Sequence, residues 1–361
     1  MEMKLKYLIY GLFILLAYGC STAGMGGANT GPKPHALGKM NEIVVIADKD
    51  LWEGAVGDTF KFYFGSAYPI MPTPEPIFDI RHFDLKDLTV APLRKELRTY
   101  VILADLNDTD SDITKMVGRD LGENKYDKSQ TDNTFNSSIG KDKWAKGQVL
   151  FYLFANGEDK LANTIGKNFP GIATRVNKHD EEKLSQSIFA GAHNLDYISL
   201  IEQKYGINIK IPMSFQKALD VEDLTWFRRD DREYTLNLVF DKKRYENQNQ
   251  LETQAIKDWI TDFGKTYVTS DQKGDKLIIN DTDLPIFDYT KEIKGAFAKE
   301  LRGTWEMTEE FLAGPFFGYS ILNEKSNEVI YALAFISAPG KVKRDRMQQL
   351  EHMIQSLEWM E

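Results

Sequence analysis

The chain of 361 residues contains a single cysteine, Cys20, and this limits how the protein can be stabilised. Without a second cysteine no disulfide can form within the chain, so its stability must come from the burial of apolar side chains. A chain of this length can bury one large core or two medium ones. Its net charge of −9 argues against binding to nucleic acid and against broad contact with anionic lipid.

The residues before this cysteine have the order of a secretory signal. Lys4 and Lys6 precede an apolar run from Tyr7 to Ala17, and small or neutral residues lead into Cys20. The run is shorter than the roughly 20 apolar residues that a transmembrane helix needs. Polar and glycine-rich residues follow it directly, so we predict a signal peptide over residues 1–19.

The run Leu16-Ala17-Tyr18-Gly19-Cys20 resembles the lipobox of bacterial lipoproteins. This resemblance implies that the thiol of Cys20 receives a diacylglycerol and that the signal is cleaved between Gly19 and Cys20. Ala17 departs from the pattern, which most often has Leu there. An ordinary signal peptide with an incidental cysteine is the alternative. In a lipoprotein the acyl chains on Cys20 would supply the affinity for the membrane.

Residues 20–38 are predicted to form a flexible tether from the lipidated cysteine. Glycines, small polar residues and two prolines dominate this segment and cannot form a core. Position 21 is not the aspartate that marks retention in the inner membrane, and no acidic run typical of surface-exposed lipoproteins follows. We therefore expect an anchor in the outer membrane, facing the periplasm.

Residues 39–206 are predicted to form an N-terminal α/β domain, with order beginning near Asn41. Short apolar and β-branched runs predict strands in EIVVIAD (42–48), FDIRHF (78–83), TYVILADL (99–106) and GQVLFYLFAN (147–156). A four-residue apolar stripe predicts a helix over 51–65. Two further helices are expected over 158–169 and 180–206, and Gly206 is the predicted C-cap and domain boundary.

Residues 207–361 are predicted to form an antiparallel α+β domain. DLTWFRR (223–229) and EYTLNLVF (233–240) indicate a hairpin, as do TYVTS (266–270) and KLIIN (276–280). VIYALAFISA (329–338) is apolar enough to be a central strand. The apolar face of the last helix, at Met347, Leu350, Ile354 and Leu357, should cover the sheet. The predicted class is α+β, with two mixed sheet-plus-helix halves.

No motif for catalysis, a metal or a cofactor is found in the sequence. The five histidines show no metal-ligand spacing, and neither a G-x-S-x-G turn nor a phosphate-binding loop is present. The acidic run at Asp105, Asp108, Asp110 and Asp112 resembles the start of a calcium loop. Counted from Asp108, however, Ile113 and Arg119 occupy its glycine and glutamate positions. Capping of a short helix by Asp110 or Ser111 is the preferred interpretation. Paired carboxylates for glycoside hydrolysis leave no spacing signature, so that class stays open.

Aromatic and basic clusters are the remaining signals. Phe62, Tyr63 and Tyr68 are candidate contacts for a partner protein or a glycan, because aromatic faces stack on sugars or clamp apolar groups. Core packing is the alternative for most of the aromatic residues. A basic group at the start of the last helix would contact an anion or an acidic partner, or form a solvated helix face. It comprises Lys341, Lys343, Arg344 and Arg346.

Four segments together resemble a family of Bacteroidota envelope lipoproteins that is catalogued as a domain of unknown function. They are LWEGAVGD (51–58), PEPIFD (74–79), GTWEM (303–307) with the following GPF, and SAPGKVKRDRMQQLEHM (337–353). The family implies a lipid anchor and a location, but no catalytic residue. The second half is also similar in element order to PsbP/Mog1-type domains, which mostly bind other proteins.

These observations predict a non-catalytic lipoprotein that binds or scaffolds another component of the periplasmic envelope. A hydrolase that acts on envelope or cell-wall glycans through dispersed carboxylates is the alternative. A carrier of a small apolar molecule is a third possibility and would need an enclosed cavity. The expected partners are the membrane, through the lipid on Cys20, and an envelope protein or glycan. No nucleic acid, cofactor or metal is expected.

Overall fold

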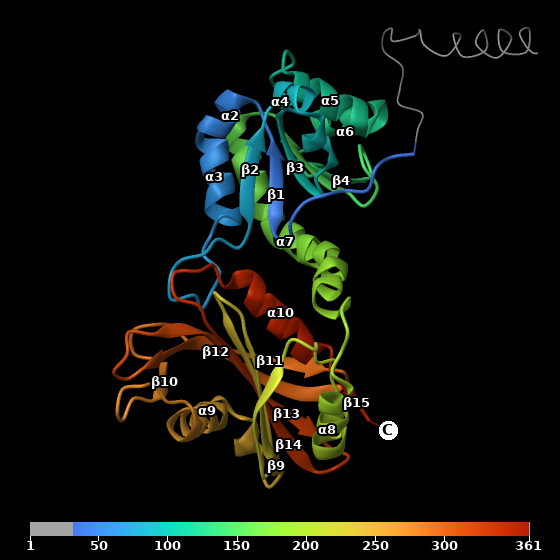
Figure 1. The fold of residues 1–361 in the computed structure, drawn as a ribbon. Coiled ribbons are helices and arrows are strands. Elements are labelled where there is room, and N and C mark those ends of the chain that lie inside the picture. Colours follow the sequence, from blue (N-terminus) through green and yellow to red (C-terminus); the bar gives the residue numbers. More distant parts are fainter. Residues whose placement is uncertain (1–31, 361) are drawn as a thin grey trace, which may run out of the picture. The chain divides into compact units, whose positions relative to one another are not determined.

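The computed structural model describes residues 32–360 (Figure 1). Gly19 and Cys20 lie outside the described residues, so their cleavage and lipidation stay predictions. From His35 onward the chain forms one compact unit. The Ala36 N–H donates to the Lys146 carbonyl at 2.8 Å. The chain therefore joins the fold before Asn41, where the sequence placed the start of order.

A five-stranded mixed sheet forms the first half, with strand order β2-β1-β3-β5-β4 (Figure 1). β4 is the antiparallel edge strand, and the other four strands run parallel. Parallel strands covered on both faces are apolar throughout, which explains the continuous apolar runs in the sequence. The strands are β1 (Glu42–Ile46), β2 (Asp79–Phe83), β3 (Thr99–Asp105), β4 (Ser137–Lys141) and β5 (Val149–Ala155).

Helices cover both faces of this sheet. One core lies under α2, α3 and α7, and the other lies under α4 and α5. The helix predicted over 51–65 is divided at Gly54, while Val56, Phe60 and Phe64 are buried as the stripe predicts. The elements are α2 (Lys49–Glu53), α3 (Ala55–Phe64), α4 (Leu85–Val90), the 3-10 helix η1 (Pro92–Glu96), α5 (Asp112–Leu121), α6 (Glu123–Thr131) and α7 (Glu158–Phe189).

The chain between 158 and 206 is divided differently from the prediction. α7 continues through Pro170, because buried residues on both sides of the proline, Leu161 and Val176 among them, pack into the same core. Tertiary burial therefore outweighs the hydrogen bond that proline removes. The break comes later, where the side chain of Asn194 caps α8 (Leu195–Tyr205) by accepting from the Tyr197 N–H at 3.2 Å. Gly206 ends α8 in the left-handed conformation, as predicted.

An eight-stranded antiparallel sheet forms the second half, in the order β10-β12-β13-β14-β9-β8-β7, with β11 also paired to β12. β14 is central, as predicted, and β8 and β9 form the predicted hairpin. The strands are β7 (Gln216–Val221), β8 (Leu224–Asp230), β9 (Thr235–Arg244), β10 (Leu277–Asn280), β11 (Phe287–Ile293), β12 (Ala296–Met307), β13 (Ala313–Asn323) and β14 (Glu328–Ser337); β6 (Ile207–Asn208) and β15 (Glu358–Trp359) pair separately.

Helices pack on both faces of this sheet. α10 (Arg344–Gln355) buries Met347, Leu350 and Ile354 against one face, which α8 also covers, and α9 (Thr253–Tyr267) packs on the opposite face (Figure 1). The predicted α+β class and the covering C-terminal helix are therefore confirmed. The prediction of a second hairpin, formed by 266–270 and 276–280, is wrong, because Tyr267 ends α9 and β10 pairs with β12. The 3-10 helix η2 (Gln248–Leu251) precedes α9.

The start of α10 is held by residues of the first half. The carboxylate of Glu75 accepts the backbone N–H groups of Lys343 and Arg344 at 2.8 to 2.9 Å, although 268 residues separate Glu75 from Lys343. The Arg344 guanidinium bonds the Pro76 carbonyl at 2.6 Å and forms an ion pair with Asp79 at 2.9 Å. The prediction of a solvated helix face is therefore wrong for Lys343 and Arg344. Both residues are buried, and the acidic groups that they contact lie in the same chain.

We expect Glu75→Ala to lower the free energy of unfolding by about 2 kcal/mol, because it leaves buried helix N–H groups without an acceptor. Urea denaturation of the full chain measures the change. Glu53→Ala is the matched control, because the Glu53 side chain is mostly exposed and forms only a surface pair with Lys49. Equal midpoints for the two variants would show that the Glu75 cap contributes nothing.

Candidate functional site

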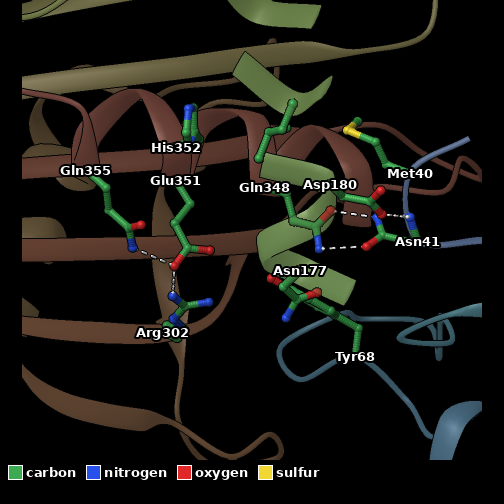
Figure 2. Close-up of a pocket in the computed structure, with 11 residues that line it drawn as sticks. Met40, Asn41, Tyr68, Asn177, Asp180, Arg302, Gln348, Glu351, His352 and Gln355 are labelled. Carbon is green, nitrogen blue, oxygen red and sulfur yellow. Dashed lines mark hydrogen bonds and ion pairs between the residues drawn. The ribbon is translucent and has the colours of Figure 1, made fainter. Parts of the chain in front are cut away.

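A polar cleft of about 380 Å³ lies where α7, α10 and β12 meet. Figure 2 shows its lining, in which α10 contributes one side, α7 a second, and Arg302 of β12 a third. Tyr68, from the loop after α3, and Asn41, just before β1, complete it. The cleft thus gathers residues from five separate parts of the sequence.

Arg302 is the centre of a buried charge network. Its guanidinium bonds the carboxylates of Glu300 and Glu351. The ammonium of Lys291 lies 2.6 Å from Glu300 and 3.6 Å from Glu351, and Gln355 donates to Glu351 at 2.9 Å. Two cations and two carboxylates therefore neutralise one another where solvent hardly reaches, since Glu300 is fully buried.

This network sets the ionisation of its members. Burial alone would raise the pKa of Glu300, but the hydrogen bond and charge of Arg302, together with Lys291, lower it overall. Burial, reinforced by the charge of Glu351, raises the pKa of Tyr68 to about 12. Burial also raises the pKa of Tyr319 well above its usual value. Glu300 therefore stays ionised and both phenols stay protonated near neutral pH.

Asp180 of α7 forms the opposite wall. Its carboxylate accepts the Asn41 N–H at 2.8 Å and pairs with Arg98 at 3.2 Å. The Asn41 side chain in turn donates to Gln348 of α10 at 2.7 Å (Figure 2). It also donates to Asp345 of α10 at 3.0 Å. These bonds hold the start of β1, the second part of α7 and α10 in one arrangement.

His352 and Ser185 lie 2.6 Å apart, the spacing of a nucleophile and its base. Burial lowers the pKa of His352, although Glu181 and Glu351 oppose this. However, Ser185 lies near the C-terminal end of α7, where backbone N–H groups are already bonded within the helix and the dipole is negative. The backbone of α7 therefore offers no donors for an oxyanion there, and the pair connects α7 with α10.

The predicted contact residues are divided between two places. Tyr68 lines the cleft, whereas Phe62 and Tyr63 lie on α3. Phe62 is 73% exposed, and Tyr63 is half-buried against Phe169, with ring centroids 5.6 Å apart. The sequence analysis missed Glu300 and Arg302. Two opposite charges at alternate positions of one strand, on the same face, were the available signal.

The acidic run after β3 serves local structure, as the capping interpretation predicts. The hydroxyl of Ser111 accepts the N–H groups of Ile113 and Thr114 at 3.1 Å, at the start of α5. Asp105 accepts the N–H groups of Asn107 and Gly157.

Between residues 32 and 360, no group of three His, Cys, Asp or Glu side chains is placed to hold a metal ion. No helix within that range is both long and apolar enough to span a membrane.

Two family models match the chain. Residues 36–189 match the family described as "Domain of unknown function (DUF8532)", and residues 194–356 match "Domain of unknown function (DUF4837)". The predicted similarity to a domain of unknown function is therefore confirmed, but it is divided between two families where the sequence predicted one. The two matches meet at the break between α7 and α8. The Bacteroidota origin stays a prediction.

The chain is also similar to solved structures of the Mog1 type. These include a mutant of the protein Mog1 and the Saccharomyces cerevisiae Ran-binding protein Mog1p. Each is 11% identical to this chain, with a TM-score of 0.28 and coverage of 43% of this chain. The matches cover 92% and 91% of those chains. No curated protein matches the chain.

Arg302→Met should lower the free energy of unfolding at pH 7 by about 3 kcal/mol, because it leaves the buried charge of Glu300 without its main partner. Arg302→Lys, which keeps the charge, should cost less. The folded state lowers the pKa of Glu300, so its stabilising effect is present above the unfolded value of about 4.3 and is lost as the pH falls below it. Urea denaturation at pH 7 and pH 3.5 measures both effects. An equal loss at both pH values would contradict the assignment.

Proposed function

We propose that this chain, in which two domains of unknown function are joined, is a lipid-anchored, non-catalytic binding or scaffolding component of the periplasmic envelope. One observation carries the non-catalytic part: the charged groups of the cleft are paired with one another. The anchor at Cys20 and the location at the outer membrane, facing the periplasm, rest on the signal and lipobox-like sequence.

The ionisation of the cleft favours binding over acid–base chemistry. A general acid or base works best when its pKa lies near the working pH. Glu300 titrates below its usual range, Tyr68 titrates near 12, and His352 below its usual value. These three groups therefore exchange few protons at neutral pH. Tyr68 and His352 line the cleft and can position a ligand, but none of the three groups is well suited to transfer its protons.

The cleft surface favours a polar partner. Amide side chains line it beside the neutralised ion network, among them Asn177, Gln348 and Gln355. Such groups both donate and accept hydrogen bonds, so a polar segment of another envelope protein is the partner that they suit. A hydrophobic segment would leave these groups without partners and lose free energy on binding.

A hydrolase of envelope glycans is the second candidate, and Asp241 is the observation that favours it. Burial raises the pKa of this carboxyl group, which accepts from the Trp259 indole N–H at 2.8 Å. It lies in a hollow of about 480 Å³ that also contains Glu222, Asp223 and Asp262. A carboxyl group with a raised pKa beside other carboxyl groups is the arrangement that glycoside hydrolysis uses. Both oxygens of Asp241 already accept protein N–H groups, which favours a structural role.

Cys20→Ala should release the protein from the membrane fraction. The reason is that acyl chains on this thiol supply the anchor, and the net charge of −9 offers no electrostatic substitute. Fractionation of cells and mass spectrometry of the N-terminal peptide measure location and acylation. A Cys20→Ala protein that stays in the membrane fraction, or an unmodified Cys20 in the wild type, would refute the anchor.

Asn177→Arg should weaken capture of the polar partner at least tenfold. Asn177 is exposed on the wall of the cleft, so arginine there fills the cleft without removing a described hydrogen bond. Affinity purification from mildly solubilised envelopes, quantified by mass spectrometry, measures the change. Asn163→Arg is the matched control, because Asn163 is exposed on the same helix but does not line the cleft. If no protein is captured stoichiometrically, or if both variants capture equally, the cleft is not the binding site.

A further inference from the structure

We propose that the second half binds an uncharged saccharide in a hollow at the C-terminal end of α9. This hollow has a volume of about 550 Å³, within the range of small-molecule sites. Its floor is formed by Trp226, Asn237, Trp305 and Phe335, and Tyr267 of α9 lies at its side. We call it the Trp226 hollow. It opens on the face of the sheet that packs against α9, opposite the face that carries α10 and the cleft.

The indole rings of the Trp226 hollow are fixed before any ligand arrives. The N–H of Trp226 donates to the Asn237 side chain at 3.0 Å, and the N–H of Trp305 donates to the Ile336 carbonyl at 3.2 Å. A Cβ at Gly314 would lie 1.9 Å from that carbonyl and 2.8 Å from the Trp305 nitrogen, so glycine lets the ring cross β13. Fixed rings lose little conformational entropy when a ligand binds.

These hydrogen bonds also decide what the rings offer to a ligand. Both indole N–H groups are used within the protein, so Trp226 and Trp305 present carbon surface and not donors. Trp226 is half-buried and Tyr267 is 38% exposed, so these two rings remain accessible. Accessible aromatic faces suit the C–H faces of a sugar ring.

The rim of the hollow is polar and can bind hydroxyl groups. The carboxylates of Asp271 and Glu310 form no hydrogen bond or ion pair within residues 32–360, and hydroxyls of Thr235 and Ser337 also line it. Free carboxylate oxygens accept hydrogen bonds from O–H donors. An aromatic floor with hydrogen-bonding edges is therefore suited to a ligand with C–H faces and hydroxyl edges, which describes a saccharide.

The charge of the rim excludes an acidic sugar. Arg228 is the cation of the hollow, and its guanidinium is already paired with Asp230 at 2.8 Å. The free carboxylates of Asp271 and Glu310 would repel a uronate or a phosphate. A purely apolar ligand would remove water from the polar rim without replacing its hydrogen bonds. The ligand is therefore an uncharged saccharide.

Isothermal titration calorimetry of the full-length chain, in a detergent without a sugar headgroup, tests the proposal. The probes are chitohexaose, maltoheptaose and xylohexaose, with oligogalacturonate as the acidic sugar and tetramethylammonium as an organic cation. We expect saturable binding of at least one uncharged oligosaccharide and at least tenfold weaker binding of oligogalacturonate.

Tyr267→Ala should weaken that binding about tenfold, because it removes an accessible stacking ring from the end of a helix. Phe297→Ala is the matched control, since this aromatic residue is 42% exposed but lies outside the hollow, and it should leave the affinity unchanged. Trp226→Phe keeps an aromatic ring but removes the indole N–H that holds the ring in place. It should therefore weaken binding less than Tyr267→Ala.

Three outcomes would overturn the proposal. These are the absence of saturable binding for every uncharged oligosaccharide, equal affinities of wild type and Tyr267→Ala, and tighter binding of tetramethylammonium than of any sugar. The last result would show that the rings and carboxylates of the hollow form a binding site for an organic cation. Asn177→Arg, which alters the cleft on the other face, should not change sugar binding, so the two proposals fail independently.

Discussion

The cap that Glu75 provides for α10 is the interaction on which the rest of the structure depends. The first N–H groups of a helix have no partner within it, and the residue at the N-cap position, Lys343, has no side chain that can accept them. The carboxylate of Glu75 supplies the acceptor and places negative charge at the positive end of the helix dipole. Arg344 then pairs with Asp79. Because α10 is fixed in this way, Glu351 and His352 point toward α7 and Arg302, and the cleft exists.

The two candidate sites illustrate different uses of buried polarity. In the cleft, Arg302 and Glu300 neutralise each other, so the site holds charge without reactivity. In the Trp226 hollow, the internal hydrogen bonds of the indoles consume their donors and leave carbon surface facing outward. Both arrangements give preformed surfaces on opposite faces of one sheet. Such a sheet can take two ligands at once without requiring any change of shape.

Much of the fold is predictable from sequence, because the pattern of apolar residues that indicates burial is contained within each short segment. The apolar runs give the parallel strands, alternation gives the β8–β9 hairpin, and the stripe through Met347 gives α10. The exceptions depend on distant residues. α7 passes through Pro170 because the core on both sides holds it, and Lys343 and Arg344 are buried because Glu75 and Asp79 lie beside them. Prediction of the cleft is limited in the same way. The alternate charges on β12 are visible in the sequence, but their contact with Glu351 and Tyr68 is not.

The Glu75 cap also has a consequence for the order in which the molecule can mature. Synthesis proceeds from the amino end, so Glu75 is made 268 residues before Lys343, at the start of α10. The first sheet can assemble while the remainder is still being made, but its contact with α10 closes a loop of 268 residues. Contacts of such high sequence separation form slowly. Until they form, the apolar face of α10 and the sheet that it covers are the surfaces most open to misassembly. A truncation before α10 would leave that face of the sheet uncovered permanently.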